Sequence, residues 1–169
     1  MEVNACIRAA RREDVPGILA VYNQAALHTL GTYDEEPQSL SQRLEWFDHA
    51  QSKHHPILVA VGGASGEEVL GWGALGPFLE RAGFRHTAVE AVYVGGASRR
   101  RGIGRRLLSA LMDEARRAAI HTVLAAVDES NVASLQLHLN AGFVLAGTFR
   151  EVAHKAGCWH TVLYLQRML

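Results

Sequence analysis

The sequence predicts a mixed α/β domain of the α+β kind, spanning residues 1–169. Segments with apolar residues at helical spacing interrupt apolar runs rich in β-branched residues, in the order β-α-α-β-β-β-α-β-α-β-β. A length of 169 residues suits one domain with a sizeable core. No internal repeat or low-complexity linker divides the chain, so we expect one domain.

The first third of the chain predicts one short strand and two helices. Residues 5–9 read as the strand, and Asp14 is expected to cap the first helix, with Pro16 in its first turn. The apolar face of this helix comprises Ile18, Leu19, Tyr22, Ala25 and Ala26. Residues 39–42 read as a capping box that opens the second helix. The apolar residues of this second helix are Leu40, Leu44 and Phe47.

The middle of the chain predicts three strands. Residues 56–61 and 69–75 form a hairpin whose turn contains Gly62, Gly63, Glu67 and Glu68. A loop over 76–84, punctuated by glycine and proline, leads to a strand over 87–94 that is rich in β-branched and aromatic residues.

The last third predicts a long helix, a buried strand over 122–127, a helix over 131–140 and closing strands over 143–149 and 159–165. Six residues at helical spacing define the buried face of the long helix. They are Ile103, Leu107, Leu108, Leu111, Met112 and Ala115.

Composition excludes several classes of protein. The formal net charge is +0, with 17 basic and 17 acidic residues, which argues against a nucleic-acid or membrane-surface binder. No apolar run approaches the ~20 residues that span a bilayer. The stretch from Met1 to Arg12 is polar and charged, so we expect no signal peptide and a cytoplasmic location. Cys6, Cys158 and the scattered histidines match no metal spacing, so we expect reduced thiols and no metal.

A glycine- and arginine-rich turn over 95–101 carries the strongest functional signal. It joins a strand to the start of the long helix, where free N–H groups and the helix dipole attract anions. Gly102 and Gly104 allow close backbone approach, and three successive arginines, Arg99 to Arg101, add charged donors. The pattern predicts a phosphate site, although a solvated basic turn is an alternative. It matches neither the Walker A motif nor the dinucleotide fingerprint.

The pattern Arg99-x-x-Gly102-x-Gly104 resembles the pyrophosphate loop of the GCN5-related N-acetyltransferase (GNAT) superfamily. Further segments resemble, in the same order, the phosphinothricin and methionine sulfone acetyltransferase branch. They are Tyr33-Asp-Glu-Glu-Pro37, Phe84-Arg-His-Thr87 with Val92-Tyr-Val94, the helix end Ser134-x-x-x-His138-x-x-x-Gly142-Phe143, and Lys155-x-Gly-x-Trp159.

The resemblance implies the GNAT fold, a mixed and mostly antiparallel sheet of about seven strands flanked by about four helices. It also implies that acetyl-CoA lies between two splayed central strands, its pantetheine arm pairing with exposed backbone. The residues then expected to contact acetyl-CoA are Val92, Tyr93, Val94, Arg99, Arg100, Arg101, Gly102, Ile103, Gly104, Arg105, Asn131, Ser134 and His138. For Asn131, a helix N-cap is an alternative role that can coexist with this one.

The resemblance assigns three catalytic tasks. The Val94 N–H is the candidate donor to the thioester carbonyl, where negative charge develops. His138, with an ordinary pKa of about 6.5, is the candidate proton donor to the departing thiolate, packing within the helix being the alternative. Glu90 is the candidate base for the acceptor amine. The branch pattern places its glutamate at Val89, so a regular strand would turn Glu90 to the other face unless a β-bulge intervenes.

The acceptor side departs further from the branch. Tyr33, Trp72, Phe78 and Arg81 are expected to line the acceptor pocket, with core packing as the alternative for the aromatic residues, and Arg81 is expected to pair with a substrate carboxylate. Leu79 replaces a branch arginine. Thr161, in place of an aspartate, further weakens transfer of the branch's substrate specificity.

We therefore expect an acetyl-CoA-dependent N-acetyltransferase that acts directly, in a ternary complex, on a small amine such as an amino acid or an analogue. The resemblance also suggests a homodimer. A non-catalytic acyl-CoA-binding module and an acetyltransferase acting on a protein or another amine remain alternatives, and no nucleic-acid or membrane partner is expected.

Overall fold

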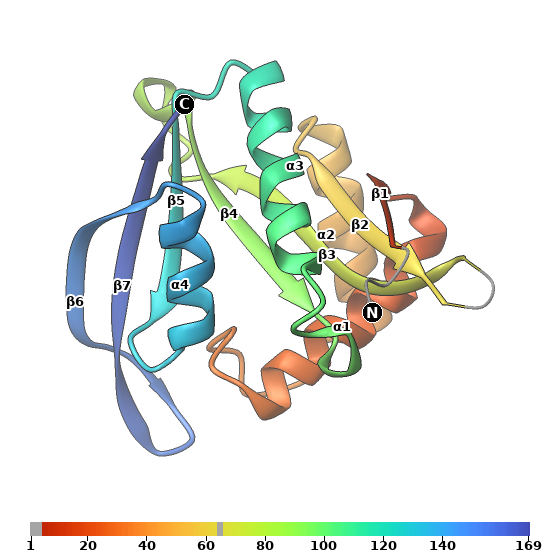
Figure 1. Cartoon of the computed structure of the whole chain (residues 1–169), viewed down its shortest axis with the longest axis horizontal. Coiled ribbons are helices and arrows are strands. Elements are labelled where there is room, and N and C mark those ends of the chain that lie inside the picture. The colour runs from red at the N-terminus through yellow and green to blue at the C-terminus, as the bar shows by residue number, and fades with distance from the viewer. Residues whose placement is uncertain (1–4, 64–65) are drawn as a thin grey trace.

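The computed structural model describes residues 5–63 and 66–169, so Met1 to Asn4 of the polar N-terminal stretch and residues 64–65 of the hairpin turn lie outside it. The described chain forms a seven-stranded sheet in the order β1-β2-β3-β4-β5-β7-β6, flanked by four α-helices (Figure 1). The elements are β1 Cys6–Ala9, α1 Val15–His28, α2 Leu40–Ser52, β2 Ile57–Gly62, β3 Glu68–Pro77, β4 Thr87–Val94, α3 Ile103–Arg117, β5 Thr122–Asp128, α4 Val132–Asn140, β6 Val144–Lys155 and β7 Cys158–Met168.

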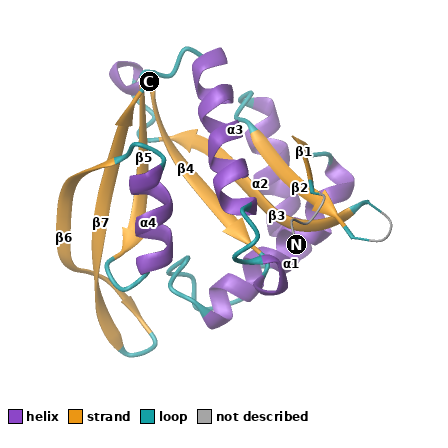
Figure 2. Ribbon diagram, viewed as in Figure 1, coloured by secondary structure: helices purple, strands orange, loops and turns teal. Residues whose placement is uncertain are grey.

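The helices cover both faces of the sheet (Figure 2). In the view of Figure 2, α3 lies in front of β3 and β4, and α4 lies in front of β5 and β7. Helices α1 and α2 lie behind the other half of the sheet, where they pack against each other and α1 packs on β3. The predicted order of elements and the predicted mixed α/β class are both confirmed.

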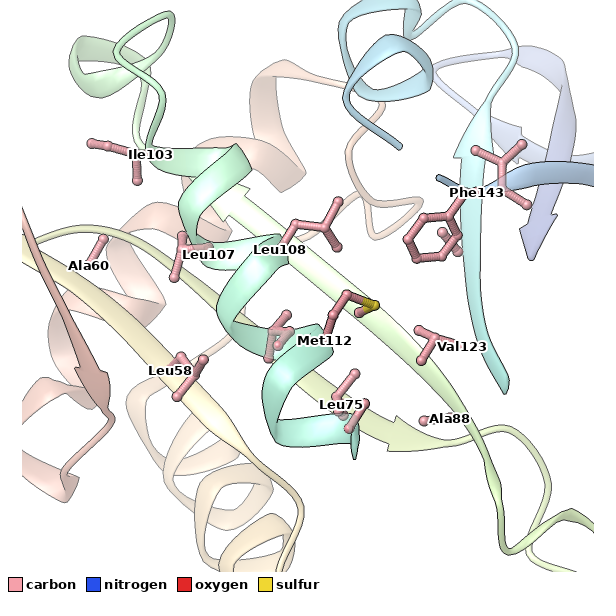
Figure 3. Packing of buried hydrophobic residues seen from close by; sticks show 14 of the residues in the cluster. Leu58, Ala60, Leu75, Ala88, Ile103, Leu107, Leu108, Met112, Val123 and Phe143 are labelled. Carbon is pink, nitrogen blue, oxygen red and sulfur yellow. The ribbon is translucent and has the colours of Figure 1, made fainter. Parts of the chain in front are cut away.

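Helix α3 supplies the centre of one hydrophobic core (Figure 3). Its predicted face is confirmed, because all six of its residues are at most 2% exposed. Leu107, Leu108 and Met112 project from this helix toward the sheet, where Leu58 and Val123 lie. A second core lies between α1, α2 and the opposite face of the sheet.

The predicted face of α2 is wrong in part. Leu40 is 44% exposed, whereas Arg43, Phe47 and Ala50 are buried. These three positions follow helical spacing, so the helix buries the stripe that begins at an arginine instead of the one that begins at a leucine. A charged residue hides this face from an analysis that counts only apolar residues.

Asp14 occupies the predicted N-cap position of α1, but its side chain does not cap the helix. Residues Arg12–Asp14 form a 3₁₀ turn, and the Asp14 side chain makes no capping bond to α1. Its carboxylate instead accepts hydrogen bonds from the Arg11 backbone N–H at 2.7 Å and from two nitrogens of Arg8 at 2.7 and 2.9 Å. These bonds take the place of the side-chain cap.

The closing hairpin is longer than expected. Strand β6 runs to Lys155, whereas the sequence predicted that it ends at residue 149. Strand β7 begins at Cys158, one residue before its predicted start. Residues 150–155 give a weak strand signal in the sequence. Pairing between β6 and β7 nevertheless continues to Lys155 and Cys158, past a register shift between Phe149 and Ala153. None of the described helices is long and apolar enough to cross a membrane.

The two central strands, β4 and β5, are paired over only part of their length. Strand β4 pairs in parallel with β5 only from Thr87 to Val89, opposite Thr122 to Leu124. Beyond these residues β5 stays paired with β7 as far as Asp128, while β4 stays paired with β3 as far as Val94. Figure 1 shows the two strands diverging toward their carboxyl ends. The splayed strands expected for the fold are therefore present.

We predict that Leu111→Ala lowers the free energy of unfolding by about 2–5 kcal/mol, because Leu111 is fully buried beneath α3 and its loss leaves a cavity. Urea unfolding followed by circular dichroism measures the change. Leu27→Ala is the matched control, since Leu27 is 53% exposed on α1, and it should change stability by less than about 0.5 kcal/mol. Equal losses in the two variants would contradict the assigned core.

Candidate active site

The parting of β4 and β5 leaves one edge of β4 without a strand partner. The Gly95 N–H donates to the Leu70 carbonyl, and the Phe78 N–H donates to the Thr87 carbonyl. The backbone N–H and C=O groups of the odd-numbered residues of β4 therefore point toward β3. The alternation of an antiparallel ladder then points the backbone groups of Glu90, Val92 and Val94 away from β3. Beyond Val89 these groups meet no paired residue of β5. The expected strand-like docking edge is therefore available.

The loop after β4 is shaped for an anion. Gly102 is the N-cap of α3 with a φ of 77°, in the left-handed region that favours glycine. The first helical bond runs from Arg106 N–H to the Gly102 carbonyl, so the N–H groups of the first turn have no partner within the helix. A Cβ on Gly104 would stand 3.4 Å from a methyl group of Leu137. Small residues therefore keep this helix start open.

The arginines of this loop differ in the contacts that their side chains make. Arg99 Nε donates to the Val94 carbonyl at 3.3 Å, which folds this side chain back onto the end of β4. Arg100, Arg101 and Arg105 are exposed, and among the described residues they form no ion pair. Three uncompensated guanidinium groups thus surround the start of α3, where the helix dipole adds further positive potential.

Helix α4 presents the other expected contacts to the same region. Asn131 is its N-cap, and its side-chain oxygen accepts from the Ser134 N–H at 3.2 Å. One turn further, His138 is 3% exposed and packs edge-on against Phe143 with ring centroids 5.2 Å apart. The cap holds the first turn of α4, and the buried ring holds its last turn against the sheet.

Glu90 and His138 form a buried pair. His138 Nε2 lies 2.8 Å from Glu90 Oε1, and each side chain is 4% exposed. His138 Nδ1 lies 2.7 Å from the Ser134 carbonyl, an acceptor only, so Nδ1 must carry a proton. The Nε2–Oε1 hydrogen bond therefore holds the further proton that the pair shares. Both ring nitrogens are engaged, so in this geometry His138 acts on any ligand through Glu90.

No β-bulge is needed to bring Glu90 to this position. Strand β4 pairs with β3 without a register shift, with Glu90 opposite Leu75 and Val89 opposite Gly76. Glu90 consequently points to the face that carries α4, while Val89 points to the face that carries α1 and α2. The regular strand therefore turns Glu90 to the face opposite that of Val89, as expected in the absence of a β-bulge, and places its carboxylate against His138.

The pair alters the titration of the histidine. Burial works to lower the pKa of His138, but the hydrogen bond and negative charge of Glu90 outweigh it and raise the pKa above 6.5. The Ser134 carbonyl acts in the same direction. The protonated imidazole is therefore favoured near neutral pH, beside a carboxylate.

A cavity of about 520 Å³ opens on the side of the sheet covered by α1 and α2, the face opposite to the one on which the Glu90 side chain meets His138. Among its charged lining residues are Glu90 and Arg43, and its aromatic lining comes from four rings. The aromatic residues are Tyr22, Trp46, Trp72 and Tyr93. Trp72 stacks on Tyr93 with ring centroids 4.7 Å apart, which makes a flat aromatic wall beside the end of β4. The space suits a small organic molecule.

Only some of the expected acceptor residues lie at this cavity. Trp72 lines it, although only 2% of the side chain is exposed and it also belongs to the second core. Phe78 packs against Phe84 at 5.7 Å and is not part of the lining. Arg81 is exposed, also outside the lining, with no ion pair among the described residues. The structure therefore does not bring Phe78 or Arg81 to the cavity.

Tyr33 lies in a separate polar cluster at the end of β5. Its hydroxyl donates to Asp128 Oδ2 at 2.9 Å, and His160 Nδ1 lies 3.2 Å from the same oxygen. Burial and this hydrogen bond raise the pKa of Tyr33, so its phenol stays protonated. The buried Lys155 holds the same loop by donating to the carbonyls of Ala26, Thr29 and Thr32 at 2.7 to 2.9 Å. Tyr33 is thus fixed across the open end of the strands.

Sequence reasoning missed Arg43 and Asp128 as residues of this region. Asp128 directly follows a predicted strand. Ser130 is a local partner, but Tyr33 and His160 lie so far from it in sequence that only the fold brings them together. Arg43 carried a weak signal, because it stands at positions i−4 and i−7 from Phe47 and Ala50 on the helix. The described residues contain no group of three or more His, Cys, Asp and Glu side chains that could hold a metal ion.

Comparisons with known proteins agree with this geometry. Residues 18–143 match the model of the Acetyltransferase (GNAT) family. The L-methionine sulfoximine/L-methionine sulfone acetyltransferase of Pseudomonas aeruginosa is 39% identical over 164 residues, covering 97% of this chain and 94% of the relative.

Two solved structures are close in fold. A ribosomal-protein-alanine N-acetyltransferase from Brucella melitensis has a TM-score of 0.92 and 37% identity, covering 97% of this chain and 99% of the other. A GNAT superfamily phosphinothricin acetyltransferase from Sinorhizobium meliloti, in complex with acetyl-CoA, has a TM-score of 0.93 and 27% identity, covering 98% and 88%. Together with the parted strands and the glycine-rich helix start, these matches show that the chain belongs to the GNAT family of acetyltransferases.

Proposed function

We propose that this enzyme transfers the acetyl group of acetyl-CoA to the amine of an amino acid or amino-acid analogue, by direct attack in a ternary complex. One observation carries the proposal. The buried Glu90–His138 pair stands at the point where β4 leaves β5, between the docking edge for the donor and the cavity for the acceptor. The names of the methionine sulfone and phosphinothricin relatives support this class of acceptor.

The residues present fit acetyl-CoA. The exposed guanidinium groups of Arg100, Arg101 and Arg105 and the free N–H groups at the start of α3 suit its pyrophosphate. The open edge at Val92 and Val94 suits the amides of the pantetheine arm. Bound acetyl-CoA supplies a thioester whose carbonyl carbon the acceptor amine attacks. The Val94 N–H lies on that edge and is our candidate donor to the carbonyl oxygen as its charge develops.

Glu90 is the base in this proposal. Its Oε1 is held by His138, while its Oε2 is buried without a hydrogen-bond partner and belongs to a residue that lines the cavity. A substrate ammonium group that reaches Oε2 through the gap between β4 and β5 would pass its proton there, leaving a neutral amine for attack. His138 holds Glu90 in place for that transfer through the Nε2–Oε1 hydrogen bond. The pair then holds the proton that the departing thiolate needs.

Two further features favour direct transfer. Cys6 and Cys158 are both exposed, at the beginnings of β1 and β7, and neither lines the cavity, so no acyl-enzyme is proposed. The cavity is bounded by aromatic rings and a buried arginine, which suits a small acceptor better than an extended peptide.

A protein acceptor is the second candidate, because a structural relative at 37% identity is named a ribosomal-protein-alanine N-acetyltransferase. Assays with free amino acids and with a peptide that begins with alanine separate the two. A non-catalytic acyl-CoA-binding role would instead show acetyl-CoA raising the melting temperature without any acceptor being consumed.

We also propose a cytoplasmic homodimer. Large apolar side chains are exposed on the closing hairpin, which ends the sheet at β6 (Figure 1). They are Val144, Leu145, Phe149, Val152 and Trp159. Exposed apolar side chains gathered on one hairpin are typical of a contact between subunits.

The first prediction concerns turnover. Glu90→Gln should lower kcat about 10²–10⁴-fold for amino-acid acceptors, because the amide cannot accept a proton. The KM for acetyl-CoA should stay unchanged. Thiol release from acetyl-CoA measures both constants. Arg101→Met should show the opposite pattern, with a raised KM for acetyl-CoA and little change in kcat. Glu45→Gln, at an exposed glutamate of α2, is the matched control. Full activity of the Glu90 variant would overturn its role.

The second prediction concerns pH. Because the pKa of His138 is raised in the folded state, its contribution to stability is complete below pH 6.5 and is lost as pH rises through the folded pKa. The wild type should therefore exceed Glu90→Gln in free energy of unfolding more at pH 6 than at pH 9. Urea unfolding of both proteins at the two pH values measures this. A difference independent of pH would show that the pair holds no shared proton.

The third prediction concerns assembly. Light scattering should give twice the chain mass of 18.4 kDa. Replacing Phe149 and Val152 with serine should shift the protein toward the monomer, because it removes apolar contact area. A monomeric wild type would contradict the homodimer.

A further inference from the structure

Four buried polar atoms without hydrogen-bond partners belong to residues that surround a single cavity. They are Nε and Nη2 of Arg43, Nε1 of Trp72 and Oε2 of Glu90. In the described chain no other buried side-chain nitrogen or oxygen is left without a partner. All three residues line the cavity beside β4. Buried polar groups are normally paired, and unpaired ones at a cavity indicate groups that a ligand completes.

The four atoms fall into two chemical types. Three are donors only, from a guanidinium and an indole, and the fourth is a carboxylate oxygen. The three donors belong to side chains on the face of the sheet that carries the cavity, whereas the Glu90 carboxylate lies on the α4 face. Donors of this kind suit a negatively charged acceptor group, such as the carboxylate of an amino acid.

Arg43 lacks a carboxylate partner in the described protein. Its guanidinium carbon lies 3.9 Å from the centre of the Tyr22 ring, 4.8 Å from that of Trp46 and 5.5 Å from that of Trp72. Aromatic faces stabilise a cation but leave its N–H groups free. The nearby Asp34 accepts from the Tyr22 hydroxyl at 2.5 Å and forms no ion pair with Arg43 among the described contacts. Burial correspondingly lowers the pKa of Arg43.

His55 also lines the cavity, and burial lowers its pKa, so it is neutral near pH 7 and leaves Arg43 as the cation there.

We propose that Arg43, assisted by the indole N–H of Trp72, binds the carboxylate of the acceptor. This inference rests on the proposed function and deepens it, because it makes a carboxylate near the amine a requirement for a good substrate. It also moves the carboxylate site from the exposed Arg81 to the buried face of α2.

The test compares acceptors that differ only in the carboxylate. L-methionine sulfone and its primary amide have the same side chain and the same amine. The wild type should prefer the acid. Arg43→Met, which keeps an unbranched side chain against the rings, should lower kcat/KM for the acid by about 30- to 1000-fold, the usual loss when a buried charge loses its partner. The amide should lose much less, and Arg43→Lys should restore part of the activity on the acid.

Controls separate binding from folding. Each variant should keep the melting-temperature increase that acetyl-CoA causes in the wild type. Arg116→Met makes the same change at an arginine that is 49% exposed on α3, and it should affect neither acceptor. Arg81→Met tests the rival position. The proposal is overturned if Arg43→Met lowers activity on acid and amide equally, or if only Arg81→Met discriminates between them.

Calorimetry measures the affinity of the carboxylate site without requiring turnover. N-acetyl-L-methionine sulfone retains the carboxylate and should bind the wild type more tightly than Arg43→Met. Equal affinities would reject the role of Arg43. A loss of this binding in the variant, together with a wild type that acetylates no amine, would instead uphold the carboxylate site and reject the proposed reaction.

Discussion

The separation of β4 from β5 after Val89 is the constraint on which the rest of the site depends. A backbone edge that loses its strand partner must satisfy its N–H and C=O groups in another way. Here both strands keep a partner on their other side, β3 for β4 and β7 for β5, so the sheet tolerates the break. The open edge, the helix start after Val94 and the buried acid of Glu90 all follow from that one irregularity.

Charge burial is the second organising feature. Glu90 and Lys155 are both buried, and each is held by hydrogen bonds from distant elements. Arg43 is as buried as they are but rests on aromatic rings, with two nitrogens unpaired. An unpaired buried donor costs about 1–3 kcal/mol. The unpaired donors lie beside a cavity, where a bound ligand can offset that cost. Such a local loss of stability is typical of binding sites.

Periodicity in the sequence was sufficient for most of the fold and for the donor loop. The long helix gave a clear signal because its six core positions are apolar and at most 2% exposed. The glycine-rich turn is local in sequence, so its chemistry could be recognised without tertiary structure. The face of α2 could not, because the Arg43 side chain rests on aromatic rings from other elements, and the side-chain cap at Asp14 could not, because its carboxylate is taken by Arg8 of the preceding strand. Short-range rules do not contain such partners.

The sequence by itself determined the order of elements, the glycine-rich turn before the long helix and the presence of an acid at Glu90 and a histidine at His138. Their meeting was decided by the tertiary structure, which brings together two residues 48 positions apart. It also decided that Arg43 lies at the cavity beside β4 and that Arg81 does not. The physical reason is that a strand's alternation and a helix's periodicity specify which face a side chain occupies. Only the packing of those faces against one another specifies which side chain stands opposite.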